Sequence, residues 1–379
     1  MSNSYQKHFL QTDNHIWFNA ASEGPLSICA REALDIVVEK KSRVHELTIE
    51  MFMRAPVELK KNIEKLINVP YRDIILGNSA SYGLHILANG IVWHEGDEIL
   101  LMQNDFPADI LPWLALEKKG VIVKQLKPQD RMLSVEELKA AITSKTRLVC
   151  LPHVHTFSGC MIDVASFSKV CRGHEVLLVI NISQSVGARP VDVTGWDVDA
   201  VVSAGYKWIC GPYGTGFCWI KPDIRNELDY NHAYWASQST EDELASEEAL
   251  VYRDVKSARK YDMFGTANFF NYTPLTTGIG LLLEIGMDEV LKHNDNLNQI
   301  FIEQLDQKLY SFISPTDKEK RSSLIVITHK DSTRNAQIHK NLTEAGLHTA
   351  FWKNNIRIAP HIFNTDEDIE KLLKHLHQE

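Results

Sequence analysis

Residues 200–217 read AVVSAGYKWICGPYGTGF, and this stretch decides the fold expected for the chain. It begins with a run of small and β-branched apolar residues, reaches Lys207 between two aromatic residues, and then has glycines at positions 211, 214 and 216. A continuous apolar run is typical of a strand buried on both faces of a parallel sheet. The stretch therefore predicts an internal strand with Lys207 directly after it.

Similar short apolar runs occur six more times in this part of the chain. The seven predicted strands are 73–77, 98–103, 120–126, 147–154, 175–182, 200–206 and 214–221. Helical patterns separate most of them, and one begins with Ser134 and Glu137 at the spacing of a capping box. Strands that alternate with helices predict an α/β protein with a layered sheet.

The pattern changes in the last third of the chain, after Pro274. The elements predicted there are a long helix through Lys292, a second through Leu309, a strand at 324–328, a helix at 332–345 and a last helix from Thr365. They indicate a smaller α+β domain. The expected division is an N-terminal segment, 1–30, that joins the small domain, a large domain, 31–270, and the small C-terminal domain, 271–379.

Composition excludes several classes of protein. The chain has 379 residues, of which 44% are hydrophobic and 23% charged, as in ordinary globular proteins. Its net charge of −9 disfavours a dedicated nucleic-acid binder. No apolar run approaches the roughly 18 residues of a membrane span, and the polar first residues carry no signal core, so we expect a cytoplasmic protein without membrane contact. Six scattered cysteines are expected to be core thiols.

Lys207 is the residue most suggestive of chemistry. A lysine among small and aromatic residues after a strand is a poor candidate for a solvated surface charge. Burial lowers the pKa of an amine, and a neutral amine can attack a carbonyl to form a Schiff base. A lysine that extends its charged end to water at a sheet edge fits this segment equally well.

The segment resembles the lysine motif of the class V aminotransferases, fold-type I pyridoxal-phosphate enzymes that include cysteine desulfurases, kynureninase and isopenicillin epimerase-like proteins. The resemblance covers most of the chain in ordered blocks. It implies a mainly parallel seven-stranded sheet in the large domain, pyridoxal 5'-phosphate as cofactor, and Lys207 as the residue that forms the Schiff base. It also implies that Ser203 and Tyr206 help to hold the cofactor phosphate.

Residues 77–85, GNSASYGLH, follow a predicted strand and open a helix. Free backbone N–H groups at a helix N-terminus bind phosphate, although small hydroxyl residues there are usually only caps. The resemblance implies a phosphate loop with Ala80 and Ser81 at the contacting positions. In the block DFPAD, 105–109, it implies that Phe106 stacks on the pyridine ring; a core phenylalanine is the commoner meaning of such a residue.

Two further blocks follow predicted strands. In HVHTFSG, 153–159, the resemblance implies that Thr156 lies near the cofactor hydroxyl or the substrate, and no metal is expected at the two histidines. In the block from 179 to 192, Gln184 is the implied partner of the cofactor's phenolic oxygen. Asn181 departs from the family, which has an aspartate there to keep the pyridine nitrogen protonated. Either the position is altered or the enzyme works with a weaker electron sink.

The remaining matches concern the substrate and a partner subunit. In the block NIRIAPHIFN, 355–364, the resemblance implies that Arg357 binds a substrate carboxylate through a bidentate pair of hydrogen bonds. A surface ion pair is the alternative for this arginine, although surface arginines rarely lie between two isoleucines. Asn19 is an implied contact on the carboxylate side. Thr266, in the block FGTA, implies a homodimer with shared active sites, since the family's threonine reaches the phosphate of the neighbouring subunit.

The predicted function is pyridoxal-phosphate chemistry on an α-amino acid, of the aminotransferase or Cβ-lyase type. Epimerisation and kynureninase-type hydrolysis are alternatives. A catalytically silent cofactor-binding relative is another, and Asn181 is its support, whereas Lys207, Gln184 and Arg357 argue against it. Cysteine desulfurases carry a nucleophilic cysteine in the C-terminal domain, and no cysteine follows Cys218 here, which disfavours that mechanism.

Overall fold

The computed structural model describes residues 5–12, 14–239, 243, 245–265 and 267–378. A seven-stranded sheet forms its centre, in the order β2-β8-β7-β6-β5-β3-β4. Its strands are β2 (Ile74–Gly77), β3 (Glu98–Met102), β4 (Ile122–Leu126), β5 (Thr146–Pro152), β6 (Leu177–Asn181), β7 (Ala200–Ala204) and β8 (Gly216–Ile220). β8 pairs antiparallel with both β2 and β7, so it runs opposite to the other six strands of this sheet. The expected mainly parallel seven-stranded sheet is therefore confirmed.

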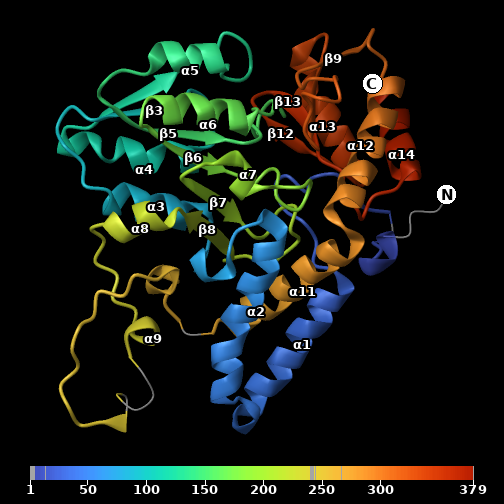
Figure 1. Cartoon of the computed structure of the whole chain (residues 1–379). Coiled ribbons are helices and arrows are strands. Elements are labelled where there is room, and N and C mark those ends of the chain that lie inside the picture. Colours follow the sequence, from blue (N-terminus) through green and yellow to red (C-terminus); the bar gives the residue numbers. More distant parts are fainter. Residues whose placement is uncertain (1–4, 13, 240–242, 244, 266, 379) are drawn as a thin grey trace.

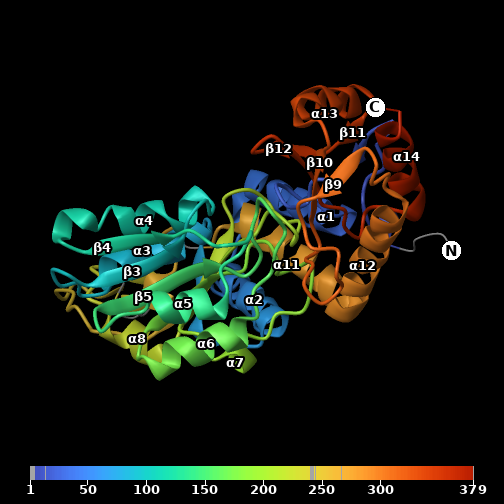
Figure 2. The same cartoon turned by 90° about the horizontal axis from the view of Figure 1, so that it is seen from above.

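Helices cover both faces of this sheet, which is why most of its strands are buried and largely apolar, while the edge strand β4 is partly exposed (Figures 1 and 2). Alternate residues of each strand enter different clusters: Val202 packs with α3 on one face, and Val201 packs with α2 and α11 on the other. The helices around the sheet are α3 (Ala80–Gly90), α4 (Leu111–Leu114), α5 (Val135–Ala141), α6 (Val164–Gly173), α7 (Val193–Trp196) and α8 (Pro222–Glu227). The Ser134–Glu137 capping box begins α5 as predicted.

Three long helices pack against one another below the sheet in Figure 1. They are α1 (Ile28–Ser42), α2 (Ile49–Ile67) and α11 (Phe269–Ile285). The prediction of a helix from Pro274 through Lys292 is wrong in its bounds. Pro274 lies inside α11, and the helix ends at Gly286, whose φ of 89° interrupts it before the next helix begins.

The rest of the C-terminal part forms a separate four-stranded antiparallel sheet in the order β12-β13-β10-β9. Its elements are α12 (Met287–Gln304), β9 (Tyr310–Phe312), β10 (Ile325–His329), α13 (Asn335–Glu344), β12 (Ala350–Trp352), β13 (Asn355–Ile358) and α14 (Asp366–Leu376). The N-terminal strand β1 (Ile16–Trp17) pairs with β11 (Leu347–His348) beside this sheet. The domain boundaries drawn from the sequence stay a prediction.

The topology places several loops at one edge of the large sheet. Parallel strands present their carboxyl ends together, and β8, which runs the other way, presents its amino end there. The loops after β3, β5, β6 and β7 therefore meet at this edge, beside the turn that follows β2. These loops carry the motifs that the sequence singled out.

Candidate active site

Lys207 lies in the loop after β7, half-buried, with its Nζ 5.5 Å from the centre of the Phe106 ring. The N-terminal segment packs on the backbone of this loop. Gly24 N donates to the Tyr206 carbonyl at 2.9 Å, and a Cβ on Gly24 would meet the Lys207 carbonyl at 2.2 Å. Only glycine fits at position 24, so the segment closes one side of the lysine loop.

The surroundings of Lys207 favour its neutral form. Burial, together with the positive charge of Arg357, lowers the pKa of Lys207 from 10.5 to about 8, while the carboxyl groups of Asp109 and Asp105 act in the opposite direction. Lysines with a lowered pKa act as nucleophiles and bases. These surroundings differ from those of a fully solvated surface lysine, and the Schiff-base role of Lys207 stays a prediction.

Asn181 ends β6 and is held on both sides of its amide. Its Nδ2 donates to both carboxylate oxygens of Asp109, at 2.8 and 3.0 Å, and its Oδ1 accepts from Ser183 N at 2.9 Å. Asp109 is 2% exposed and belongs to the loop that carries Phe106. The sequence motif included Asp109, but its pairing with Asn181 was not predicted.

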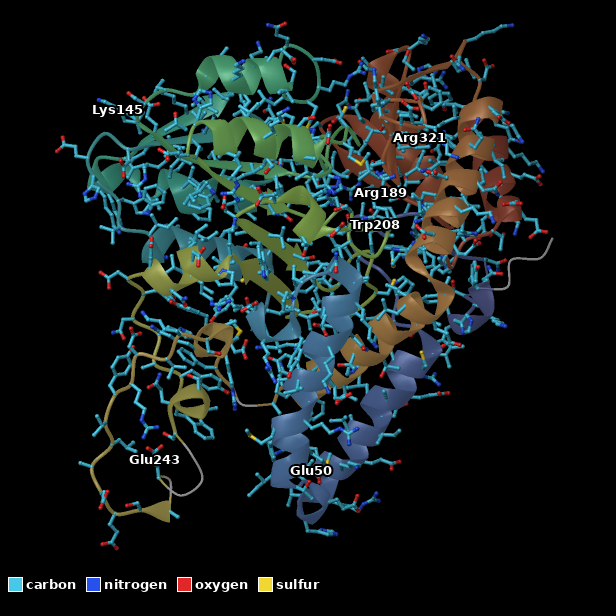
Figure 3. All side chains as sticks on the ribbon, viewed as in Figure 1. Glu50, Lys145, Arg189, Trp208, Glu243 and Arg321 are labelled. Carbon is cyan, nitrogen blue, oxygen red and sulfur yellow. The ribbon has the colours of Figure 1, made fainter. Side chains whose placement is uncertain are left out.

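Gln184 is fully engaged by its neighbours. Its Nε2 donates to the Ala21 carbonyl and to Thr156 Oγ1, both at 2.9 Å, and its Oε1 accepts from the Trp208 indole at 2.9 Å. Figure 3 shows Trp208 where the sheet meets the C-terminal elements. The structure thus brings Gln184 and Thr156 together next to the loop of Lys207, and their roles toward the cofactor stay predictions.

Arg357, on β13, crosses from the C-terminal sheet to these loops. Its guanidinium donates to the Thr156 carbonyl at 3.3 Å, to Asn19 Oδ1 at 3.1 Å and to Ser22 Oγ at 2.6 Å. The side chain is 2% exposed, and burial lowers the pKa of Arg357 to about 10. Within the part of the chain that the structure describes, no carboxylate lies at ion-pair distance from it, and its Nε has no partner. Ser22 was not predicted.

The implied phosphate residues are placed unequally. Ala80 and Ser81 form the first turn of α3, where the backbone N–H groups point out of the helix. Tyr206 is half-buried, and its ring packs against that of Tyr213 with centroids 5.0 Å apart and the planes tilted by 35°. The Ser203 hydroxyl, by contrast, is buried and donates to the Ala204 carbonyl at 2.9 Å, so the strand itself uses it. Thr266 lies outside the described residues.

The two histidines of the block at 153–159 have structural surroundings. Burial lowers the pKa of His153 to about 3, and its ring packs edge-on against Trp196 at 4.7 Å. His155 contacts Ser158 Oγ at 2.8 Å and the Asn104 carbonyl at 3.2 Å. Among the described residues, no group of three or more His, Cys, Asp or Glu side chains is placed to hold a metal ion.

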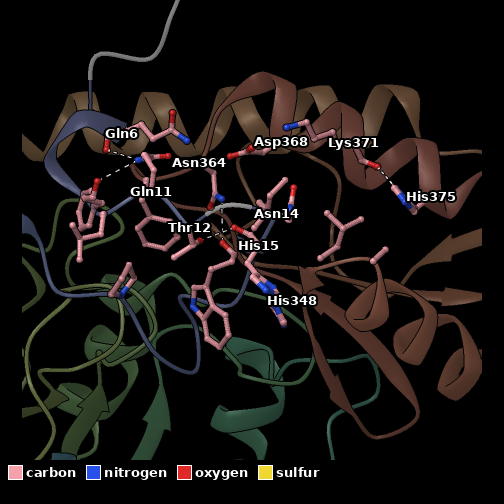
Figure 4. Close-up of a pocket in the computed structure, with 18 residues that line it drawn as sticks. Gln6, Gln11, Thr12, Asn14, His15, His348, Asn364, Asp368, Lys371 and His375 are labelled. Carbon is pink, nitrogen blue, oxygen red and sulfur yellow. Dashed lines mark hydrogen bonds between the residues drawn. The ribbon is translucent and has the colours of Figure 1, made fainter.

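A pocket of about 670 Å³ lies elsewhere, between the N-terminal segment and α14 (Figure 4). His15 and His348 line it, with ring nitrogens 2.9 Å apart, together with Asp368 and Lys371. It contains none of the predicted site residues that the structure describes. The loops around Lys207, rather than this pocket, are therefore the candidate active site.

Comparisons with known proteins agree with this geometry. The family model for class V aminotransferases matches residues 30–372. The chain belongs to this family. A probable cysteine desulfurase of Methanothermobacter thermautotrophicus is 24% identical over 95% of this chain and 93% of its own length. An uncharacterized aminotransferase of Bacillus subtilis is 23% identical over 82% of this chain and 80% of its own.

Solved structures share the fold. The cystine C–S lyase C-DES, in complex with its product cysteine persulfide, has a TM-score of 0.87 and 22% identity over 96% of this chain and 97% of that one. The apo cysteine desulfurase of Thermococcus onnurineus also has a TM-score of 0.87, with 18% identity over 100% and 98% of the two chains. The fold-type I class is thereby confirmed, and the cofactor of this class V aminotransferase is pyridoxal 5'-phosphate.

The residues present fit that cofactor. Phe106 offers a ring face 5.5 Å from the amine that would bond to the aldehyde. The N-terminus of α3 offers N–H groups to the phosphate. Asp105 Oδ2 is buried without a hydrogen-bond partner, which marks a polar site that a bound group would complete.

The described part of the chain has no helix long and apolar enough to cross a membrane.

Proposed function

We propose that this enzyme cleaves the Cβ–S bond of a sulfur-containing amino acid, with a disulfide such as cystine as substrate. The observation that carries the proposal is a buried Arg357 without a carboxylate partner, together with the half-buried Lys207, at a site whose cysteines are buried and poorly placed to accept sulfur. The first two features suit an α-amino acid. The third suits a substrate that carries its own sulfur acceptor.

Arg357 supports the binding of an α-carboxylate. A buried cation is unfavourable unless an anion pairs with it, and a guanidinium matches a carboxylate through two parallel hydrogen bonds. Its charge also lowers the pKa of Lys207, and the guanidinium bonds to the N-terminal segment that packs on the Lys207 loop, so both side chains can act on one small molecule. Asn19 and Ser22 would orient the guanidinium while the substrate carboxylate binds.

Lys207 supports proton transfer at the substrate α-carbon. When bound, pyridoxal phosphate supplies an electron sink that makes the α-hydrogen acidic. The Lys207 amine, with a pKa near 8, can take that proton near neutral pH and hold it as an ammonium. Asp109 and Asp105 stabilise the resulting positive charge, and Phe106 limits water on one side of the amine.

The cysteines of this chain disfavour sulfur transfer to the protein. All six are free thiols, five of them buried, and burial raises the pKa of all five buried thiols, including Cys210 at about 12. Cys29 is half-buried and contacts Ser27 Oγ at 3.2 Å. A buried thiol with a raised pKa is a poor nucleophile. The sulfur must then leave within a small molecule.

The proposed reaction is balanced by water alone. Lys207 removes the α-proton, the Cβ–S bond breaks, and its electron pair leaves with the sulfur as cysteine persulfide. Hydrolysis of the remaining three-carbon fragment gives pyruvate and ammonia. Cystine and one water therefore yield cysteine persulfide, pyruvate and ammonia, with no external oxidant or reductant.

The test is to incubate the cofactor-loaded enzyme with cystine and to measure pyruvate and persulfide in parallel. Equal amounts of both are expected, and a Cys29→Ser variant should retain the activity. Keto-acid formation that requires an added amino-group acceptor would instead show transamination and overturn the lyase assignment. Persulfide on the protein, found by mass spectrometry in the parent and lost with Cys29→Ser, would also overturn it.

We further propose that the enzyme is a cytoplasmic homodimer. Its free thiols are in keeping with a reducing compartment. Large apolar side chains at Ile36, Ile49, Val251 and Phe264 are more than half exposed, which is typical of interaction surfaces. Light scattering should give twice the chain mass, and an Ile36→Glu/Ile49→Glu variant should shift toward the monomer. A monomeric parent at micromolar concentration would contradict the dimer.

A further inference from the structure

The carboxylate that class V aminotransferases place at position 181 is not missing from this site. Asp109 lies against the amide that stands there, and both of its oxygens accept from Asn181 Nδ2, at 2.8 and 3.0 Å. Ser183 N donates to the other side of the amide at 2.9 Å. An N–H donor on one side and a carboxylate on the other allow only one orientation of the amide. The negative charge therefore lies on Asp109, one side chain beyond position 181.

We propose that Asp109 is a positioning residue that acts through Asn181 and supplies the negative charge for the pyridine nitrogen of the bound cofactor. Hydrogen bonds in series polarise one another, so an amide that donates to a carboxylate becomes a stronger acceptor at its oxygen. Asp109 is 2% exposed and Asn181 9%, and a charge in such surroundings is weakly screened. The pair therefore acts as a single acidic unit at the end of β6.

Three other titratable groups face Asp109: Asp105 on the same loop, Lys207 and the thiol of Cys150 on β5. Burial raises the pKa of Asp109 to about 6, against the hydrogen bond from Asn181 and the charge of Lys207. Burial and the Asp109 charge raise the pKa of Asp105 well above its ordinary range. Burial also keeps Cys150 protonated. With a pKa of about 6, Asp109 is mainly ionised at neutral pH.

The hydrogen-bond geometry allows the charge to be moved back without changing the shape of the pair. Asp109→Asn removes the charge, whereas Asn181→Asp places two carboxylates about 3 Å apart, where they compete for one proton. The double variant Asp109→Asn/Asn181→Asp keeps one carboxylate, one amide and a reversed hydrogen bond. Asp105→Asn is the matched control, since it removes the other carboxyl of the same loop, which makes no hydrogen bond to Asn181.

The experiment is to load each protein with pyridoxal phosphate labelled with ¹⁵N in the ring and to titrate the ring-nitrogen chemical shift against pH, without any amino acid. The parent and the Asp105→Asn control should share one protonation midpoint. Asp109→Asn should lower it by at least one pH unit, a tenfold change in the protonation constant. The double variant should restore the parent midpoint or exceed it. Thermal unfolding of the apo proteins, run in parallel, should show a loss for Asn181→Asp that the double variant repairs.

A merely structural role for Asp109 would lower the melting temperature of Asp109→Asn and leave the midpoint unchanged, and that result overturns the proposal. If Asp109→Asn fails to bind the cofactor, the double variant decides: a midpoint below that of the parent overturns the proposal. The inference rests on cofactor binding by the proposed enzyme but not on the bond that is cleaved. A parent that binds the cofactor but does not act on cystine would therefore refute the lyase assignment alone.

Discussion

The lowered pKa of Lys207 makes the rate at which the protein captures its cofactor predictable. Only a neutral amine attacks the aldehyde of pyridoxal phosphate. With a pKa of about 8, about one-tenth of the Lys207 amine is neutral at pH 7, against about one in 3,000 for the ordinary value of 10.5. Recombination of the apoprotein with cofactor at pH 7 should therefore be ~300-fold faster than an unperturbed lysine would allow.

The pH profile measures this directly. The rate of covalent capture, followed by stopped-flow absorbance, should rise with pH and level off above about 8. Arg357→Gln removes a positive charge that lowers the pKa of Lys207, so its midpoint should move to higher pH. Each unit of that movement slows capture at pH 7 about tenfold.

A matched control removes a different charge from the same sheet. Lys353 is exposed, lies 5.0 Å from the Phe157 ring and does not contribute to the pKa of Lys207, so Lys353→Gln should leave the midpoint unchanged. A parent midpoint near pH 10 would refute the burial argument. A midpoint that Lys353→Gln moves as far as Arg357→Gln does would refute the specific role of Arg357.

Three further variants test other parts of the structure. Lys207→Ala should leave only non-covalent cofactor; a borohydride-stable adduct at another lysine, found by peptide mapping, would contradict the assignment. Arg357→Ala should weaken amino-acid binding by ~2–5 kcal/mol at unchanged cofactor content. The parent should bind decarboxylated substrate analogues as poorly as this variant binds the amino acid. If the parent shows equal kinetics with carboxylated and decarboxylated analogues, Arg357 does not bind the carboxylate. Lys60→Met leaves the buried Asp262 carboxylate without its ion-pair partner, the Lys60 amine 2.8 Å away. The variant should lose about 3–5 kcal/mol of unfolding free energy. Because burial raises the pKa of Asp262, that loss should shrink as pH falls and the carboxyl becomes neutral; a thermal melt series with Lys60→Met/Asp262→Asn as control measures it.

The large sheet was predictable because burial on both faces leaves a continuous apolar run, and each of the seven runs became a strand. The strands end sooner than predicted where backbone pairing stops: the run at 200–206 forms a strand only over Ala200–Ala204. In the C-terminal part, one glycine decided the outcome. The apolar pattern runs on past residue 286, but the positive φ of Gly286 divides it between α11 and α12.

The sequence predicted which loops meet at this edge of the sheet, but it did not predict how their side chains pair. Each motif follows a strand, so the topology alone brings the loops of Phe106, Thr156 and Lys207 to one edge. No local pattern connects Arg357 to Asn19, which lies 338 residues earlier in the chain, or Asn181 to Asp109, 72 residues earlier. Such pairs depend on how the C-terminal sheet and the loops pack, and only the folded chain determines that.

The contacts of Arg357 couple substrate binding to the lysine loop. Its Nη2 donates to Asn19 and Ser22, so a substrate carboxylate that takes this nitrogen must displace at least one of them. Both belong to the segment whose Gly24 bonds to the Tyr206 carbonyl, directly before Lys207. Because nothing larger than glycine fits between position 24 and the Lys207 carbonyl, a shift of this segment would also displace the backbone of Lys207. The arginine that recognises the amino acid and the amine that acts on it are thus joined by one short stretch of the N-terminal chain.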